Sequence, residues 1–165
     1  MKKSIVTIMA MLMILSVLSA CGSSKETPPE TTSQVSIDDV VNKIKSVNPV
    51  ADERTIDDFA LENEMGLEPE MIEEYKGVIT NSQNDCALIF VAKAKDGKTR
   101  ELKQALSDYL EGLSANDLYA EFADKIEKTK QAKVLVYGDH VVLVIAGLDV
   151  DNDDVIKAVN EAFGE

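Results

Sequence analysis

Between residues 36 and 165, apolar side chains recur mostly at the three- and four-residue spacing that is typical of amphipathic helices. The most regular stripe consists of Leu102, Ala105, Leu106, Tyr109, Leu110 and Leu113. Similar stripes predict a helix from Ser36 to Asn48, a helix that begins near Asn116, and a last helix over 155–163. A weaker pattern predicts a helix over 55–65, followed by a helical turn over 69–74. The spacing therefore predicts about four to five helices.

Four shorter apolar runs predict β-strands over 75–80, 86–93, 134–137 and 140–146. A polar stretch joins the first two strands, and only Gly138-Asp139 separates the last two, so each pair forms a hairpin. The runs 86–92 and 141–146 are apolar on both faces, which is typical of central strands covered on both sides. The expected fold is α+β, with a four-stranded, mainly antiparallel sheet of two hairpins. Helices on both faces, or a homodimer formed through the sheet, would each provide the cover.

The first 21 residues follow a different pattern. Lys2 and Lys3 precede an apolar run over 5–18, which is shorter than the roughly 20 residues that a transmembrane helix needs. A positive start, a short apolar stretch and small residues before a cleavage point predict a secretory signal peptide. The end of this segment, Leu18-Ser19-Ala20-Cys21, resembles the lipobox of bacterial lipoproteins. This resemblance implies a thioether-linked diacylglycerol on Cys21 and cleavage after Ala20, whereas ordinary secretion is the alternative.

These patterns divide the chain into three parts. Residues 1–20 are the predicted lipoprotein signal peptide, 21–35 the lipidated Cys21 and a flexible linker, and 36–165 a single α+β domain. The linker is rich in Ser, Thr, Pro and Glu and has no apolar side chain that could join a core. We therefore expect the protein on the extracytoplasmic face of the cell membrane, where its N-terminal lipid is the membrane contact.

The charge of the chain narrows the range of partners. The formal net charge is −13, and it becomes −15 when residues 1–20 are removed, because Lys2 and Lys3 leave and no acid does. This sign argues against nucleic acid as a partner, since phosphates are neutralised by Lys and Arg. It also argues against binding of anionic headgroups by the folded part. A protein partner in the cell envelope remains compatible with the charge.

Three segments of the domain resemble a known family. They are the block over 65–75 (Met-Gly-Leu-Glu-Pro-Glu-Met-Ile-Glu-Glu-Tyr), the strand that runs into Lys93-Ala94-Lys95-Asp96, and the turn before Val141-Val142-Leu143-Val144. Together they resemble the small Firmicutes lipoproteins grouped as domain of unknown function 4358, over roughly residues 37–163. The resemblance implies an extracytoplasmic lipoprotein and provides no activity or site residue.

The acidic segment over 149–154 has the opening spacing of a calcium-binding loop, with acids at positions 1, 3 and 5. A complete loop has Gly at position 6 and Glu at position 12. Here Asp154 and Asn160 occupy these positions, and Glu161 is one residue late. Acids at the start of a helix also cap free N–H groups and complement the helix dipole. We favour capping and predict no metal site.

Catalytic arrangements are weak in this sequence. Cys86, His140 and Asp139 could form a cysteine-nucleophile set, but Cys86 begins an apolar strand and is expected to be a small buried residue. If Cys21 is lipidated, Cys86 has no intramolecular disulfide partner. The adjacent acids Asp38/Asp39, Asp57/Asp58 and Glu73/Glu74 could suggest glycoside hydrolysis, but they lie near helix ends and are expected to be solvated.

The sequence therefore predicts no catalytic residue, no cofactor and no metal ligand. The favoured function is non-catalytic binding or scaffolding at the cell envelope by a lipid-anchored domain. The alternative is an envelope hydrolase or a metal-dependent module that uses surface carboxylates.

Overall fold

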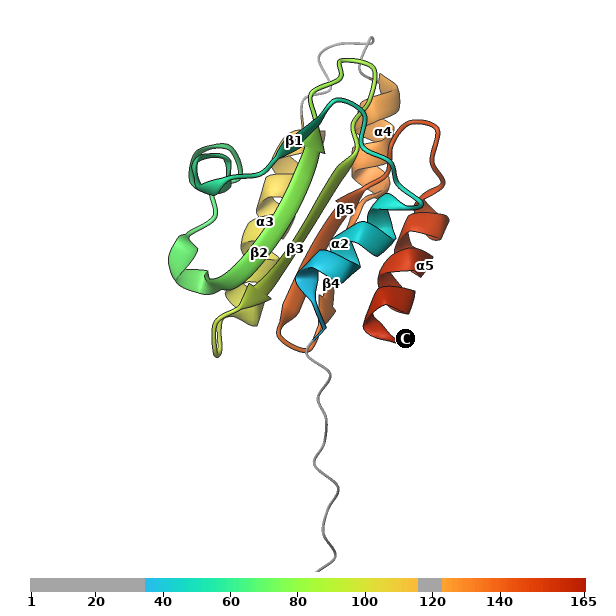
Figure 1. Cartoon of the computed structure of the whole chain (residues 1–165). Helices are drawn as coiled ribbons and strands as arrows, with labels where there is room; N and C mark the ends of the chain where they lie inside the picture. The colour runs from blue at the N-terminus through green and yellow to red at the C-terminus, as the bar shows by residue number, and fades with distance from the viewer. Residues whose placement is uncertain (1–34, 116–122) are drawn as a thin grey trace, which may run out of the picture. The chain divides into compact units, whose positions relative to one another are not determined.

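The computed structural model describes residues 35–115 and 123–165, which belong to one compact unit (Figure 1). Its elements are α2 (Ile37–Lys45), β1 (Glu53–Thr55), the π-helical turn η1 (Ala60–Glu64), the 3-10 turn η2 (Pro69–Met71), β2 (Ile72–Thr80), β3 (Leu88–Ala94), α3 (Thr99–Ser114), α4 (Ala123–Gln131), β4 (Lys133–Tyr137), β5 (His140–Ile145) and α5 (Asn152–Phe163). The predicted signal peptide, Cys21, most of the linker and the predicted helix start at Asn116 lie outside the described residues.

The sheet is antiparallel throughout, with the strand order β1-β2-β3-β5-β4. Both predicted hairpins form, as β2–β3 and β4–β5, and the α+β class is confirmed. The two hairpins join through β3 and β5, whose register runs from Leu88↔Ile145 to Lys93↔His140. The prediction of four strands is wrong, because β1 adds a fifth strand by pairing Arg54 with Ile79 of β2.

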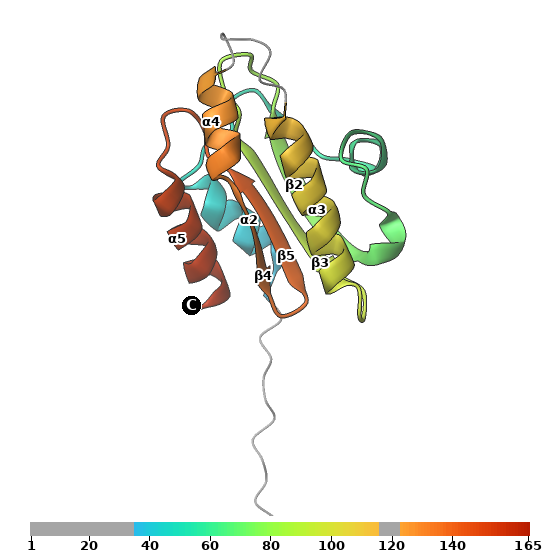
Figure 2. The ribbon, with the colours of Figure 1, turned by 180° about the vertical axis from the view of Figure 1, so that it is seen from behind.

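Helices cover both faces of the sheet within a single chain. Figure 1 shows α2 and α5 in front of the sheet, and Figure 2 shows α3 and α4 on the opposite face. Side chains of β3 alternate between these layers: Phe90 packs in the α3 core, whereas Ile89 and Val91 pack in the α2–α5 core. The two-sided apolar pattern of β3 and β5 thus reflects two separate hydrophobic cores.

The predicted helix over 55–65 forms only in part, over residues 58–64. Thr55 ends β1, and the helix begins at Asp58 and continues as the π-helical turn Ala60–Glu64, with a π-type bond from the Met65 amide to the Ala60 carbonyl at 3.0 Å. The apolar spacing in this segment does mark buried residues, but the backbone follows the strand pairing of β1 and then turns. Likewise, the predicted turn over 69–74 ends early, since β2 already begins at Ile72.

A buried polar contact closes one end of the sheet. Asn48 is fully buried; its Nδ2 donates to the Ile145 carbonyl at 3.0 Å, and its Oδ1 accepts from the Gly147 amide at 2.9 Å. The side chain thereby continues the hydrogen bonding of β5 beyond its last residue and ties it to the end of α2. From the sequence we predict only that Asn48 ends a helix.

Candidate interaction site

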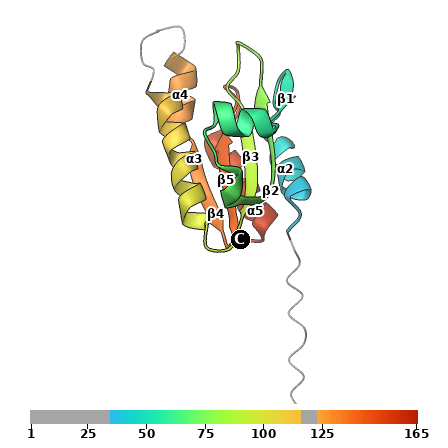
Figure 3. The same ribbon diagram turned by 90° about the vertical axis from the view of Figure 1, so that its left-hand side faces the viewer.

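The segment 56–68, which we name the Phe59 loop, connects β1 to η2 and contains a short helix that ends in the π-helical turn η1. It is the teal and green segment at the front of Figure 3, beside β1 and β2. π-helical turns such as η1 are rare in proteins, and many of those that occur lie at functional sites.

The inner side of the Phe59 loop is anchored in the α3 core by buried residues: Ile56, Ala60, Leu61, Met65 and Leu67. Strand β2, which lies under the loop, leaves space for one of these side chains. A Cβ atom on Gly77 would lie only 2.7 Å from Cδ1 of Ile56 and 2.8 Å from Cδ2 of Phe90. Glycine at this position of β2 therefore leaves the space that Ile56 occupies.

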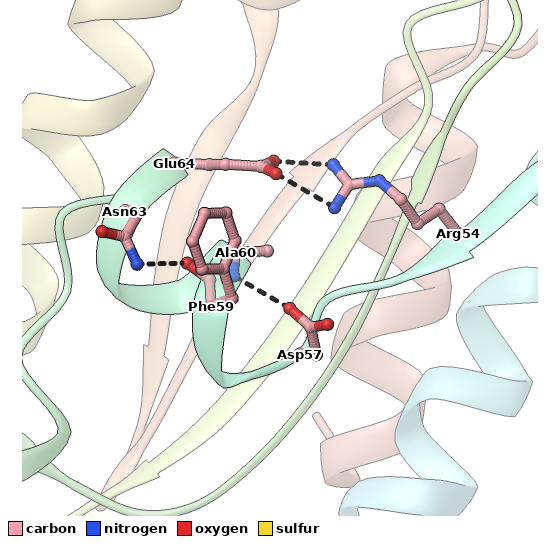
Figure 4. Close-up of polar contacts among 6 residues, drawn as sticks. All are labelled: Arg54, Asp57, Phe59, Ala60, Asn63 and Glu64. Carbon is pink, nitrogen blue, oxygen red and sulfur yellow. Dashed lines mark hydrogen bonds and ion pairs between the residues drawn. The ribbon is translucent and has the colours of Figure 1, made fainter.

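Hydrogen bonds fix the outer side of the Phe59 loop (Figure 4). Asp57 Oδ1 accepts from the Ala60 amide at 2.9 Å, and Asn63 Nδ2 donates to the Phe59 carbonyl at 3.0 Å. Arg54 of β1 donates two bonds to Glu64, Nη2 to Oε2 at 2.6 Å and Nη1 to Oε1 at 3.3 Å. This bidentate pair is partly exposed, so it adds little stability, but it fixes the distance between the two ends of the loop.

A further bond joins the loop to β2. The Tyr75 hydroxyl donates to Asp58 Oδ1 at 2.6 Å. Burial, together with this bond and the negative charge of Asp58, raises the pKa of Tyr75 to about 12. The phenol therefore remains protonated, and able to donate, throughout the physiological pH range.

Phe59 itself is exposed on this fixed backbone. Its side chain is 68% exposed, whereas the other exposed large hydrophobic residues of the described domain reach only 37–40%. Because Asp57, Ala60 and Asn63 hold the backbone on either side of it, local geometry keeps the ring in solvent. The sequence places Phe59 on the apolar stripe of a helix. Phe59 does lie in a helical segment, but its side chain is exposed instead of buried.

The stretch of chain around Phe59 is acidic, although Arg54 and Lys93 of neighbouring strands pair with two of its acids, Glu64 and Glu73. Residues 57–74 contain eight Asp or Glu residues and no Lys or Arg: Asp57, Asp58, Glu62, Glu64, Glu68, Glu70, Glu73 and Glu74. All eight are exposed. The absence of bases from this stretch was visible in the sequence, and it is the signal that could have directed attention to the loop.

The residues that could form a cysteine-nucleophile set do not come together. Cys86 lies beyond the Leu88↔Ile145 end of the β3–β5 pair, and its thiol donates to the Ala146 carbonyl at 3.4 Å. His140 lies opposite Lys93 at the other end, where its Nδ1 is 2.7 Å from Asp139 Oδ1. Burial, reinforced by Asp85, raises the pKa of Cys86 to about 11, so the thiol is protonated.

The adjacent acids have separate contacts. Asp38 forms an ion pair with Lys76, Glu73 pairs with Lys93 at 2.8 Å, and Asp57 and Asp58 serve the loop bonds described above. In the 149–154 segment, Asp151 is the N-cap of α5 and accepts from the Asp153 amide at 2.7 Å. Within residues 35–115 and 123–165, no group of three or more His, Cys, Asp or Glu side chains is arranged to hold a metal ion.

An open depression of about 420 Å³ lies at the Asn48 end of the sheet, lined in part by Asp85, Gly147 and Leu148. Asp85 Oδ1 already accepts from the amides of Cys86, at 2.8 Å, and Leu148, at 3.3 Å. These contacts connect loops to one another, so we assign the polar groups here to the structure of the sheet end.

Comparison with protein families agrees with the resemblance found in the sequence. A family model described as Domain of unknown function (DUF4358) matches residues 46–146. The chain belongs to this family. The match includes all five strands and the whole Phe59 loop, whereas α2 and α5 lie outside it.

No curated protein and no solved structure matches the chain. In the described parts of the domain, no helix combines the length and the apolar character needed to cross a bilayer.

Proposed function

We propose that this DUF4358 protein is a lipid-anchored, extracytoplasmic binding protein, and that the Phe59 loop contacts a partner protein in the cell envelope. The observation that carries the proposal is the 68% exposed Phe59 on a hydrogen-bonded, acidic loop. Aromatic side chains that enter a pocket of the partner supply much of the affinity of many protein interfaces. A loop that is already ordered also loses less conformational entropy on binding.

Charge defines the chemistry of the partner. Eight exposed acids without a base in residues 57–74 favour a basic surface that has an apolar pocket for Phe59. Negative charge around the ring also opposes its insertion among anionic lipid headgroups. Binding should therefore weaken as salt concentration rises, because the charged rim of such an interface is exposed to screening.

Binding is favoured over catalysis by the state of the reactive side chains. Cys86 is protonated and hydrogen-bonded to a carbonyl, and His140 lies at the opposite end of the β3–β5 pair. The alternative, an envelope hydrolase or a metal-dependent module, would require surface carboxylates to act without these groups. Turnover of a wall-derived substrate that is lost on changing one carboxylate, with the fold intact, would support this alternative.

A photo-crosslinking experiment tests the loop. The full chain, with benzoylphenylalanine in place of Phe59, is irradiated in its native membranes. We expect one main adduct to a protein with a basic contact surface, and less of it at high salt. The matched control carries the crosslinker at Val47, which is 37% exposed at the end of α2. Equal yields at both positions would contradict the proposal, and adducts to lipid would indicate a membrane contact instead.

The anchor is tested separately. Cys21→Ala removes the predicted lipid attachment, so the protein should leave the membrane or persist as an uncleaved precursor. Detergent phase partitioning measures this, and Cys86→Ala, which keeps the Leu18–Cys21 segment, should remain anchored. A mature, membrane-bound Cys21→Ala protein would show that the lipoprotein prediction is wrong.

A further inference from the structure

The two edges of the sheet differ in a way that bears on self-association. The β1 edge is three residues long and polar: Glu53, Arg54 and Thr55. The β4 edge is five residues long and mainly apolar, and Val136 on it is 40% exposed. Exposed apolar edges pair readily with other strands, so folded proteins normally cover or charge them.

The hairpin register shows which backbone groups of β4 face outward. Gly138, with φ of 61°, and Asp139 form the two-residue turn, so Tyr137 and His140 are a hydrogen-bonded closing pair. Because hydrogen-bonded and non-bonded pairs alternate along an antiparallel ladder, the backbones of Leu135 and Lys133 also point toward β5. The N–H and C=O groups of Val134 and Val136 therefore point away from the sheet.

We propose that a second copy of this chain pairs with β4 of the first, antiparallel, about a two-fold axis at Leu135. In this register Val134 of each copy lies opposite Val136 of the other. The outward-facing N–H and C=O groups of these four valines then form hydrogen bonds between the copies. The valine side chains share one face of the sheet, where β-branched cross-strand pairs are favourable. The result is a continuous sheet of ten strands, with β4 of each copy at its centre.

Charge favours a second copy over another strand. The start of β4 is basic, with Lys133 exposed, whereas Asp139 follows its end. Burial raises the pKa of Tyr137, and the nearby negative charge of Glu165 raises it further. Two-fold symmetry places Lys133 opposite Tyr137 of the other copy, beside these acids. This pairing leaves the Phe59 loop free, because that loop lies beside the β1 edge.

Cysteine crosslinking tests this register. Across the proposed axis, Leu135 faces itself in a non-hydrogen-bonded pair, whose Cα atoms are about 4.5 Å apart, within the range of a disulfide. The full chain with Leu135→Cys, oxidised mildly in membranes, should form a disulfide-linked dimer. The dimer should be lost when Val136→Lys is added. Thr55→Cys at the β1 edge is the matched control, and the unmodified chain controls for Cys86.

A second measurement does not depend on the half-buried Leu135. By sedimentation in detergent, the unmodified lipidated chain should be a dimer, and Val136→Lys should be a monomer with an unchanged circular dichroism spectrum. A monomeric unmodified chain, or Leu135→Cys crosslinking no better than Thr55→Cys, would overturn the proposal. A Leu135→Cys adduct with a different protein would overturn it too, by showing that the edge receives another partner.

Discussion

The two faces of the sheet are covered in different ways. On one face, α2 and α5 are regular helices with side-chain N-caps at Ser36 and Asp151. On the other face, α3 shares the cover with the irregular Phe59 loop, which leaves an aromatic ring in solvent. The first face is closed by the stacking of Tyr137 on Phe163, with ring centroids 4.2 Å apart.

Under the proposed function, this difference separates stability from recognition. The α2–α5 layer packs its buried apolar side chains against the sheet, and both helices lie outside the family match. The face with the Phe59 loop lies largely within the match and contains the most exposed aromatic side chain of the described domain. We therefore expect substitutions in both cores to reduce stability, and substitutions at the outer surface of the loop to affect binding alone.

The largest effects should come from truncations in the two cores. Leu106→Ala on the α3 face and Ile44→Ala on the α2 face each remove a fully buried side chain and should cost about 2–5 kcal/mol. Urea denaturation measures both, and Leu113→Ala, at a position that is 39% exposed, is the control with a small effect. A wild-type midpoint for either variant would show that its face is not a true core.

A substitution below the Phe59 loop should have the next largest effect. Gly77→Ala places a methyl group 2.7 Å from Ile56 and 2.8 Å from Phe90, so overpacking should cost about 1–3 kcal/mol. The matched control is Gly112→Ala on α3, where nothing lies within 4 Å of the new methyl group. That variant should be more stable by about 0.5–1 kcal/mol, because alanine favours the helix. If both variants changed the free energy of unfolding in the same direction, the packing of Ile56 on β2 would be contradicted.

Removal of the N-cap of α5, on the opposite face of the sheet, should reduce stability by a smaller amount. Asp151→Ala removes the bond to the Asp153 amide and should cost about 1 kcal/mol. Millimolar calcium should shift the melting temperature of the wild-type protein no more than a generic salt does. If calcium caused a saturable shift of the melting temperature and Asp151→Ala abolished it, Asp151 would be a metal ligand and not only a helix cap.

The smallest effect concerns the bond between Tyr75 and the loop. Tyr75→Phe should cost about 0.5 kcal/mol, since one hydrogen bond to an exposed carboxylate is lost. The pKa of Tyr75 is raised in the folded state, so its contribution is complete below pH about 10 and is lost as pH rises through about 12. NMR titration of the tyrosine ring measures this pKa. A value near 10 would mean that the hydroxyl is not bound to Asp58.

Local patterns predicted the regular elements well. The stripe around Leu106 became α3, the segment capped by Ser36 became α2, and the two-residue turn at Gly138 produced the β4–β5 hairpin. In each case the residues that define the element lie within a few positions of one another. Spacing and turn chemistry therefore contain the necessary information.

The Phe59 loop could not be predicted in the same way. Residues 55–65 have helix-like apolar spacing, but the pairing of Arg54 with Ile79 fixes their start as a strand, and the Arg54–Glu64 ion pair then closes the loop. Such contacts join residues that sequence periodicity does not relate. For the same reason, the sequence does not predict that Asn48 bonds to the end of β5, because its hydrogen-bond partners lie near residue 146.

By itself, the sequence determined the α+β class, the two hairpins, the regular helices and the DUF4358 resemblance, because these depend on short-range patterns and recognisable segments. Only the tertiary structure decided that β3 pairs with β5, that β1 joins the sheet, and that Phe59 remains exposed. The physical reason is that each of these features depends on which distant surfaces meet. An apolar residue is buried only if the folded backbone brings another surface against it.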